Sequence, residues 1–133
     1  MENATIQSST LSQKTASVIA LIIGVMSVFA GTRVLLEIDI KDYNVLIWLV
    51  FYNVIFGAIS LVVAYHIWKN STIAKHLSLF ILIMHFTVLL YLKFINTTVA
   101  SESIMAMSFR TSVWVLIVVL SILIPKYFRK KQK

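Results

Sequence analysis

Four long apolar segments dominate the chain and decide what it can fold into. Crossing the hydrocarbon core of a bilayer, roughly 30 Å thick, takes about 20 apolar residues of helix. Four segments of this length or longer are separated by short polar connections, so we expect membrane spans at residues 15–36, 44–68, 73–95 and 103–125. These spans cover most of the 133 residues, and we expect no soluble domain among them.

The spans have the pattern of helices and not of barrel strands. A barrel strand has about ten residues that alternate between polar and apolar, whereas these segments are apolar on every face. The chain is 59% hydrophobic and 13% charged, while soluble domains carry about a quarter charged residues. The single proline, Pro125, lies where the last helix is expected to end. The predicted fold is an all-α integral membrane protein, an antiparallel bundle of four transmembrane helices.

Basic residues are unevenly divided between the two sides of the membrane. The side that holds both termini and the second connection carries eight of the twelve, at Lys14, Lys69, Lys75 and in the tail KYFRKKQK. The opposite side carries four of the five acidic residues. The positive-inside rule therefore predicts that both termini are cytoplasmic. We expect a multi-pass protein of a bacterial inner (plasma) membrane.

The two ends of the chain are polar. Residues 1–13 have few large apolar groups, which predicts a flexible arm before a membrane domain at 14–126. Residues 127–133 form a basic tail, which we expect to contact anionic lipid headgroups and no nucleic acid. The sequence VFA before Gly31 resembles a signal-peptide cleavage site, but the apolar run continues beyond it, so we expect a retained span.

Small residues recur with helical spacing in the first two spans. They are Ala20, Gly24, Ser27 and Gly31 in the first span, and Asn53, Gly57, Ser60 and Ala64 in the second. This spacing places a narrow stripe on one face of each helix. Helix association in lipid relies on close backbone approach. We therefore expect these two spans to form a tight hairpin.

Aromatic residues gather near the ends of the spans. Tyr43, Trp48 and Tyr52 lie near the first connection, and their positions favour an interfacial belt. Trp114 is the exception because it lies nearer the middle of the membrane. We therefore count it among the candidate site residues.

A permanent cation, Arg110, lies inside the fourth span. It is seven residues from Ser103, about 10 Å along a helix. An Arg costs about 2.5 to 3.5 kcal/mol at the bilayer centre and less toward the interface, so it must be paired, hydrated or extended to the surface. Helical spacing places Arg110 on one face with Met107, Trp114 and Ser121.

Other polar side chains reach a similar depth from the same side. Asn53 lies nine residues into the second span, and His85 lies about ten residues from the end of the third. Arg33 is near the end of the first span, where Glu37, one turn further on, can form an i, i+4 ion pair with it. We expect Arg110, Asn53 and His85 to face one interior. Four charged residues are expected around its mouth: Arg33, Glu37, Lys93 and Glu102.

These residues predict a polar pocket in the outer half of the bundle. A guanidinium donates in a planar fork that suits carboxylate or phosphate, so we expect binding or transport of a small anionic or hydrogen-bonding ligand. The candidate ligand-binding residues are Arg110, Asn53, His85, Arg33, Glu37 and Trp114. A structural interpretation stays open, in which Arg110 pairs with Glu102 or Glu37 at the interface and Asn53 bonds across helices. His85 would then bond a hydroxyl such as that of Ser27 or Thr87.

Catalytic and cofactor signatures do not occur in the sequence. It has no HExxH, nucleophile elbow or P-loop, and no acidic pair inside a span. It has no cysteine, and His85 lies about 13 Å deeper than His66 and His76, so the three histidines do not share one metal or haem. We expect a non-enzymatic protein without metal or cofactor.

An accessory or assembly subunit of a larger membrane complex is the alternative function. The small-residue stripes, together with Met105 and Met107, would then contact the partner. A homo-oligomer is also compatible with the sequence. In size the chain resembles small four-helix proton-coupled drug exporters, but these depend on a Glu within the first helix, and here no acidic residue precedes Glu37 in the first span.

Overall fold

The structure, a computed structural model, describes residues 2–131 as helices and their connections, with no strand in this range. In chain order the elements are α1 (Glu2–Leu35), α2 (Ile47–Trp68), α3 (Thr72–Phe94), α4 (Ser101–Val118), the π-helical turn η1 (Val119–Leu123) and α5 (Ile124–Lys131). Four helices are long and apolar enough to cross a membrane, with α4, η1 and α5 forming the fourth. An all-helical protein with four candidate spans is thereby confirmed, and it indicates an integral membrane protein.

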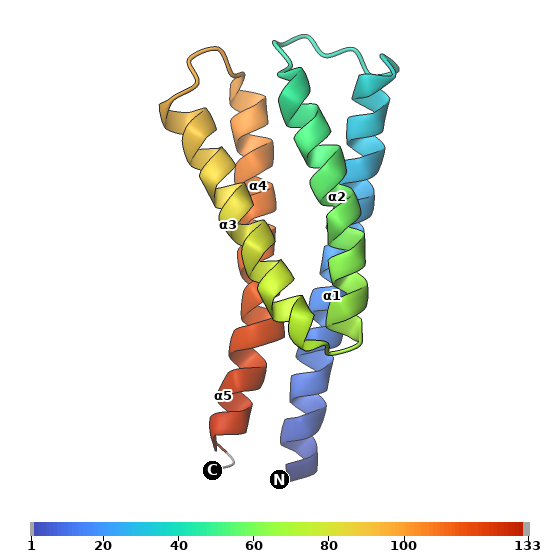
Figure 1. Cartoon of the computed structure of the whole chain (residues 1–133), viewed down its shortest axis with the longest axis vertical. Coiled ribbons are helices and arrows are strands. Elements are labelled where there is room, and N and C mark those ends of the chain that lie inside the picture. The colour runs from blue at the N-terminus through green and yellow to red at the C-terminus, as the bar shows by residue number, and fades with distance from the viewer. Residues whose placement is uncertain (1, 132–133) are drawn as a thin grey trace.

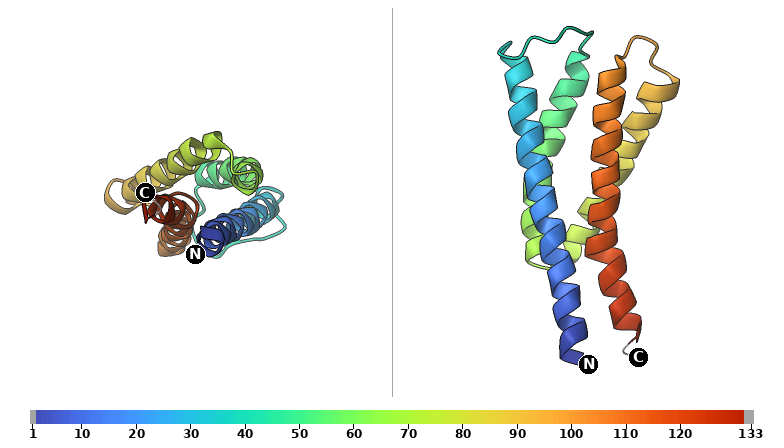
Figure 2. Two further views of the ribbon diagram at one scale, coloured as in Figure 1. Left: turned by 90° about the horizontal axis from the view of Figure 1, so that it is seen from below. Right: turned by 180° about the vertical axis from the view of Figure 1, so that it is seen from behind.

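The helices are arranged as two hairpins (Figure 1). α1 packs on α2 along much of its length, and α3 packs on α4. The connections at residues 36–46 and 95–100 lie at one end of the molecule, which we call the loop end (Figure 1). The two chain termini lie together at the other, the terminal end (Figure 2). The two hairpins diverge toward the loop end, where Asn44 Nδ2 donates to Thr98 O at 3.1 Å.

Two glycines allow backbone contact between α1 and α2. A Cβ atom on Gly57 would lie 2.9 Å from Ser27 Cβ and 3.0 Å from Gly24 O. A Cβ atom on Gly24 would lie 2.9 Å from Gly57 O. Ser17 Oγ also donates to Ala64 O at 2.6 Å and so links the same two helices. The predicted tight hairpin between the first two spans is confirmed.

The face of α4 that points inward is the one that helical spacing predicts. Trp114 is fully buried, Met107 is buried on the same helix, and Ser121 is buried in the following turn η1. Met105 points away and is 65% exposed. Because Met107 lies in the core, it is not available to a partner protein. Apolar side chains such as Phe29 cover the outer faces, as contact with lipid requires.

The first residues of the chain, where we expect a flexible polar arm at 1–13, are helical in the structure. Residues 2–13 continue α1 without a break, and residue 1 lies outside the described range. Hydroxyls such as that of Ser8 donate to carbonyls one turn earlier, which satisfies them within the helix. Gln13 Nε2 donates to Asn70 Oδ1 at 2.9 Å, so this extension is held against the α2–α3 turn.

We expect the last helix to end at Pro125, but in the structure the helix continues past this residue. The chain continues as α5, and residues 132–133 of the basic tail lie outside the described range. In a regular α-helix the proline ring clashes with the carbonyl four residues earlier, here that of Ser121. The turn that precedes Pro125 is widened into the π-helical η1. Such a bulge accommodates the proline within a continuing helix.

Candidate functional site

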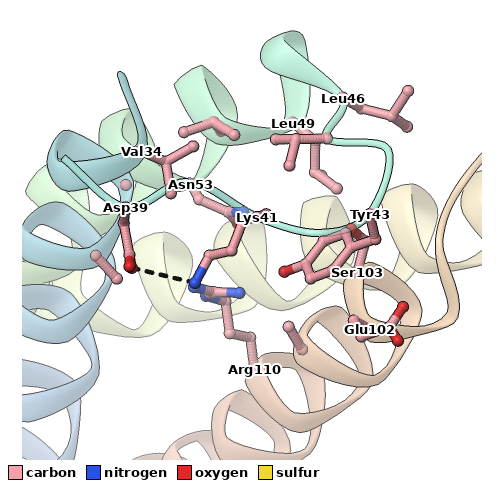
Figure 3. A pocket seen from close by; sticks show the side chains of 15 residues that line it. Val34, Asp39, Lys41, Tyr43, Leu46, Leu49, Asn53, Glu102, Ser103 and Arg110 are labelled. Atoms are coloured by element: carbon pink, nitrogen blue, oxygen red, sulfur yellow. Dashed lines mark hydrogen bonds and ion pairs between the residues drawn. The ribbon is translucent and has the colours of Figure 1, made fainter. Parts of the chain in front are cut away.

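A cavity of about 190 Å³ lies at the loop end, between α1, α2, the 36–46 connection and α4. Its polar lining includes Asp39, Lys41, Asn53, Glu102, Ser103 and Arg110. The remaining wall is mostly apolar and includes Val34 and Leu49. Figure 3 shows the side chains of Lys41 and Arg110 directed toward the same space.

Arg110 enters this cavity from α4, nine residues or about 14 Å along the helix from Ser101. Its Nε donates to Ser27 Oγ at 3.2 Å, which is its only hydrogen bond within the described residues. No carboxylate of residues 3–130 lies within 4.0 Å of the guanidinium, since both ion pairs at this end involve Asp39. The two terminal nitrogens of Arg110 are therefore available to a ligand.

Asn53 faces the same cavity from α2. Its Oδ1 is buried and accepts no hydrogen bond from the residues that the structure describes. A buried polar atom without a partner costs about 1 to 3 kcal/mol, and a ligand with a donor group would remove this cost. The structure thus brings together Arg110, which supplies donors, and Asn53, which supplies an acceptor.

His85 and Trp114, which we expect among the site residues, do not line this cavity. His85 is 3% exposed, and a hydrogen bond of 2.8 Å joins its Nδ1 to Tyr52 Oη. The ring of Trp114 packs edge-on at 6.4 Å from the His85 ring. Tyr52 is partly buried and packs against the hydrophobic core. Together these three side chains form one cluster inside the bundle, joined by the His85–Tyr52 hydrogen bond and by ring contacts.

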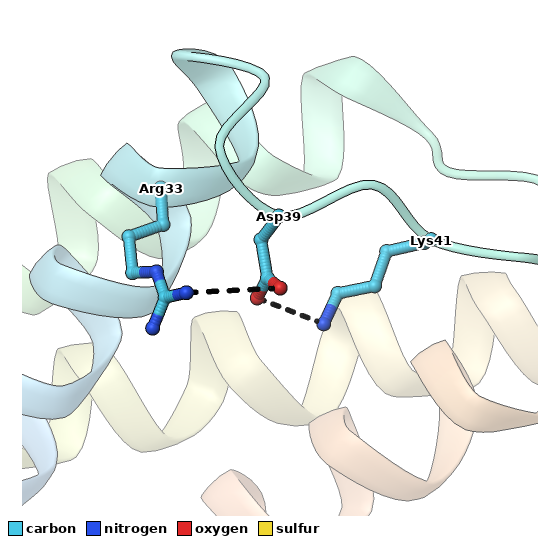
Figure 4. Close-up of polar contacts among 3 residues, drawn as sticks. All are labelled: Arg33, Asp39 and Lys41. Atoms are coloured by element: carbon cyan, nitrogen blue, oxygen red, sulfur yellow. Dashed lines mark hydrogen bonds and ion pairs between the residues drawn. The ribbon is translucent and has the colours of Figure 1, made fainter.

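Arg33 and Glu37 do not form the ion pair that their spacing predicts. Beyond the last residue of α1, Leu35, Glu37 adopts a left-handed conformation (φ 56°), and the N–H of Ile38 donates to Arg33 O at 3.0 Å. This Schellman-type end takes Glu37 off the helix, so it is not one turn beyond Arg33. Arg33 Nη2 lies 3.9 Å from Asp39 Oδ1 instead (Figure 4). Neither Arg33 nor Glu37 lines the cavity.

Asp39 is the centre of charge pairing at the loop end. Lys41 Nζ donates to Asp39 Oδ2 at 3.1 Å, beside the longer contact with Arg33. The hydrogen bond from Lys41, followed by the charge of Lys41, lowers the pKa of Asp39 below its usual 3.8. Asp39 is therefore ionised at neutral pH and offsets the charge of Lys41. Arg110 is left as the cation of the cavity without a carboxylate partner among the described residues.

Sequence reasoning missed three residues of this site. Ser27 belongs to the small-residue stripe, and its hydroxyl lies opposite Arg110; a hydroxyl at matching depth on another span is a signal that could have identified it. Asp39 and Lys41 lie in the irregular 36–46 connection, where periodicity gives no positional information. Their inclusion depends on how the end of α1 turns the chain.

Comparison with known proteins gives no further guide to function. No protein-family model matches the chain, and neither a curated protein nor a solved structure matches it. Within the described residues no group of three or more histidine, aspartate or glutamate side chains is placed to hold a metal ion. The functional argument therefore rests on the cavity and its lining.

Proposed function

We propose that this protein is a non-catalytic membrane protein that binds or transports a small anionic or hydrogen-bonding ligand in the loop-end cavity. One observation carries the proposal. Arg110 lies in the cavity with only Ser27 as a hydrogen-bond partner among the described residues. A bound carboxylate or phosphate would supply the charge-assisted, bidentate hydrogen bonds that the protein itself does not.

In this proposal the bundle is antiparallel, with its terminal end in the cytoplasm and its loop end outside. The excess of Lys and Arg at the terminal end supports this orientation. The basic tail would then lie beside the anionic headgroups of a bacterial inner membrane. The loop-end cavity would belong to the outer half of the bundle and receive its ligand from outside.

The size and charge of the cavity limit the ligand. Pockets for drug-sized molecules are about 300 to 1,000 Å³, whereas this one is about 190 Å³. Glu102 lines the cavity two turns closer to the loop end than Arg110 and accepts a hydrogen bond from Ser101 Oγ at 3.2 Å. A small ligand whose anionic group points inward toward Arg110, away from Glu102, fits this arrangement.

The alternative role of an accessory subunit has less support. The small-residue stripes of α1 and α2 contact each other through Gly24 and Gly57, and Met107 lies in the core. Most of the features that would have formed a contact surface are therefore used inside the bundle. Met105 remains exposed, but a single side chain does not define an interface.

The proposal predicts that small anions stabilise the purified full-length protein through Arg110. A ligand that binds only the folded state at a hundred times its Kd adds about 2.7 kcal/mol. We expect at least one anion from a panel of carboxylates, phosphate and inorganic anions to raise the melting temperature, and Arg110→Gln to abolish the shift. Thermal unfolding in detergent micelles, followed by circular dichroism, measures this effect.

Arg33→Gln is the matched control for this experiment. It removes the same charge at the same end of the molecule, but Arg33 does not line the cavity. We expect the stabilising anion to act on this variant as on the unmodified protein. The proposed function would be contradicted if both variants lost the anion's effect on the melting temperature equally, or if no anion stabilised the unmodified protein.

A further inference from the structure

A second polar cavity, of about 320 Å³, lies at the terminal end. It is lined by Gln13 of α1, Lys75 of α3, Ile122 of η1, and Pro125, Lys126 and Arg129 of α5. Two further cavities, of about 200 and 10 Å³, share Gln13 with it. The larger of these also shares Arg129, and the smaller shares Lys75. Together they form a polar recess around Gln13, far from the loop-end cavity.

The recess carries three cations and no described acidic side chain. Lys75, Lys126 and Arg129 have no carboxylate of residues 3–130 within 4.0 Å, because the ion pairs of this range lie at the loop end. Lys14 and Lys69 nearby differ, since each lies over an aromatic ring, at 5.2 Å from Trp68 and 5.8 Å from Tyr65 respectively. Three positive charges from two helices therefore converge on one cavity.

The wide turn η1 helps to build this recess. It lets α5 continue past Pro125, which is buried, so that Lys126 and Arg129 face α1 and α3. Two buried polar side chains belong to the recess. Gln13 lines all three cavities and is 8% exposed. Ser121 lines the smallest one with Lys75, and its Oγ has no hydrogen-bond partner within the described residues. π-helical turns are frequent at functional sites. This one places donors and cations around the same opening.

We propose that the terminal-end recess binds the phosphate group of an anionic ligand. Arg129 offers a planar fork, and the two lysines add point charges, which is a common composition of phosphate sites. The recess lies where α1, about 51 Å long, projects beyond a hydrocarbon core of roughly 30 Å, so it is at headgroup depth. Ile122 and Pro125 give it an apolar wall. This position favours a phospholipid headgroup, and basic pockets between spans bind such groups.

The test uses the full-length protein in neutral detergent, with thermal unfolding as the readout. Three probes are titrated: short-chain phosphatidylglycerol, phosphatidylcholine of the same chain length, and soluble glycerol phosphate. We expect phosphatidylglycerol to stabilise the protein and phosphatidylcholine not to. Each recess cation should contribute about fivefold to the affinity for phosphatidylglycerol. We therefore expect an affinity about fivefold weaker in each of the variants Lys75→Gln, Lys126→Gln and Arg129→Gln, and about a hundredfold weaker in the triple variant.

Matched controls separate this site from general attraction to a basic surface. Lys69→Gln and Lys130→Gln remove the same charge from the same end but do not line the recess. We expect both to bind phosphatidylglycerol within about twofold of the unmodified protein. Stabilisation by glycerol phosphate that the triple variant loses would support a soluble phosphate ligand at the same site. The proposal would be overturned if the control variants lost as much affinity for phosphatidylglycerol as the recess variants do. It would also be overturned if phosphatidylcholine stabilised the protein as much as phosphatidylglycerol does.

Discussion

Replacing Gly57 with leucine is expected to destabilise the bundle by about 3 kcal/mol, at the upper end of the usual cost of overpacking. Even the Cβ atom of the new side chain would lie 3.0 Å from Gly24 O and 2.9 Å from Ser27 Cβ. Gly24 O is a backbone atom and has no rotamer into which it can move away. The two helices would have to separate, which removes the van der Waals contacts that hold them together in lipid. Unfolding in mixed micelles on titration with sodium dodecyl sulfate, followed by circular dichroism, gives the free energy.

Two controls test whether this backbone contact causes the loss. Ala58→Leu enlarges the neighbouring residue, which is exposed, and should change stability by no more than about 0.5 kcal/mol. A Cβ atom on Gly31 would meet a side-chain atom, Val54 Cγ2, so Val54→Ala should rescue Gly31→Ala. If Gly57→Leu is as mild as Ala58→Leu, α1 and α2 do not meet in this way.

Trp114→Ala is the second substitution with a large expected effect, a loss of about 3 kcal/mol. Trp114 is fully buried, and its removal would leave a cavity beside His85. Truncation of a buried Trp costs about 3 to 5 kcal/mol in soluble proteins. We expect the lower end of this range because escape from water contributes little between helices in lipid. The same titration with sodium dodecyl sulfate measures the loss.

Trp48→Ala is the matched control, since it removes the same side chain from a position that is 44% exposed. Its expected cost is below about 1 kcal/mol, because the exposed ring leaves no enclosed cavity. If the two substitutions cost the same, Trp114 does not lie in the packed core of the bundle.

The spans and the α1–α2 hairpin could be predicted because both depend on local sequence. The length of an apolar run decides whether a helix can cross a membrane, whatever its neighbours are. The contact through Gly24 and Gly57 follows from spacing along each helix, since only small residues allow backbones to meet. The inward face of α4, with Met107 and Trp114, follows from the same periodicity.

The composition of the candidate site could be predicted only in part. Sequence gives the depth of a residue in the membrane but not the neighbour that it faces. Arg110 and His85 lie at similar depth, yet Arg110 contacts Ser27 of α1, whereas His85 contacts Tyr52 of α2. How the two hairpins pack on each other decides this, and that packing depends on residues far apart in the chain.

The irregular parts of the chain were predicted least well. Asp39 lies beside Arg33 because Glu37 adopts a left-handed conformation, and a glutamate gives little indication of such a turn. The helix continues past Pro125 because η1 widens before it. A proline in the sequence indicates a break more often than a bulge. Both features depend on tertiary contacts that outweigh local preference.

The central claim is that Arg110 attracts a ligand that enters the loop-end cavity from outside. A thiol placed in this cavity would test the claim most directly. The chain has no cysteine, so Asn53→Cys would carry the only thiol. In right-side-out membrane vesicles, we expect an impermeant anionic thiol reagent to modify it about fivefold faster than a neutral reagent of similar size, because a unit charge at about 4 Å contributes about 1 kcal/mol even in water. Arg110→Gln should remove this preference, and Ile55→Cys, which faces lipid, should not react. An unreactive Asn53→Cys, or a preference that Arg110→Gln leaves unchanged, would contradict the account.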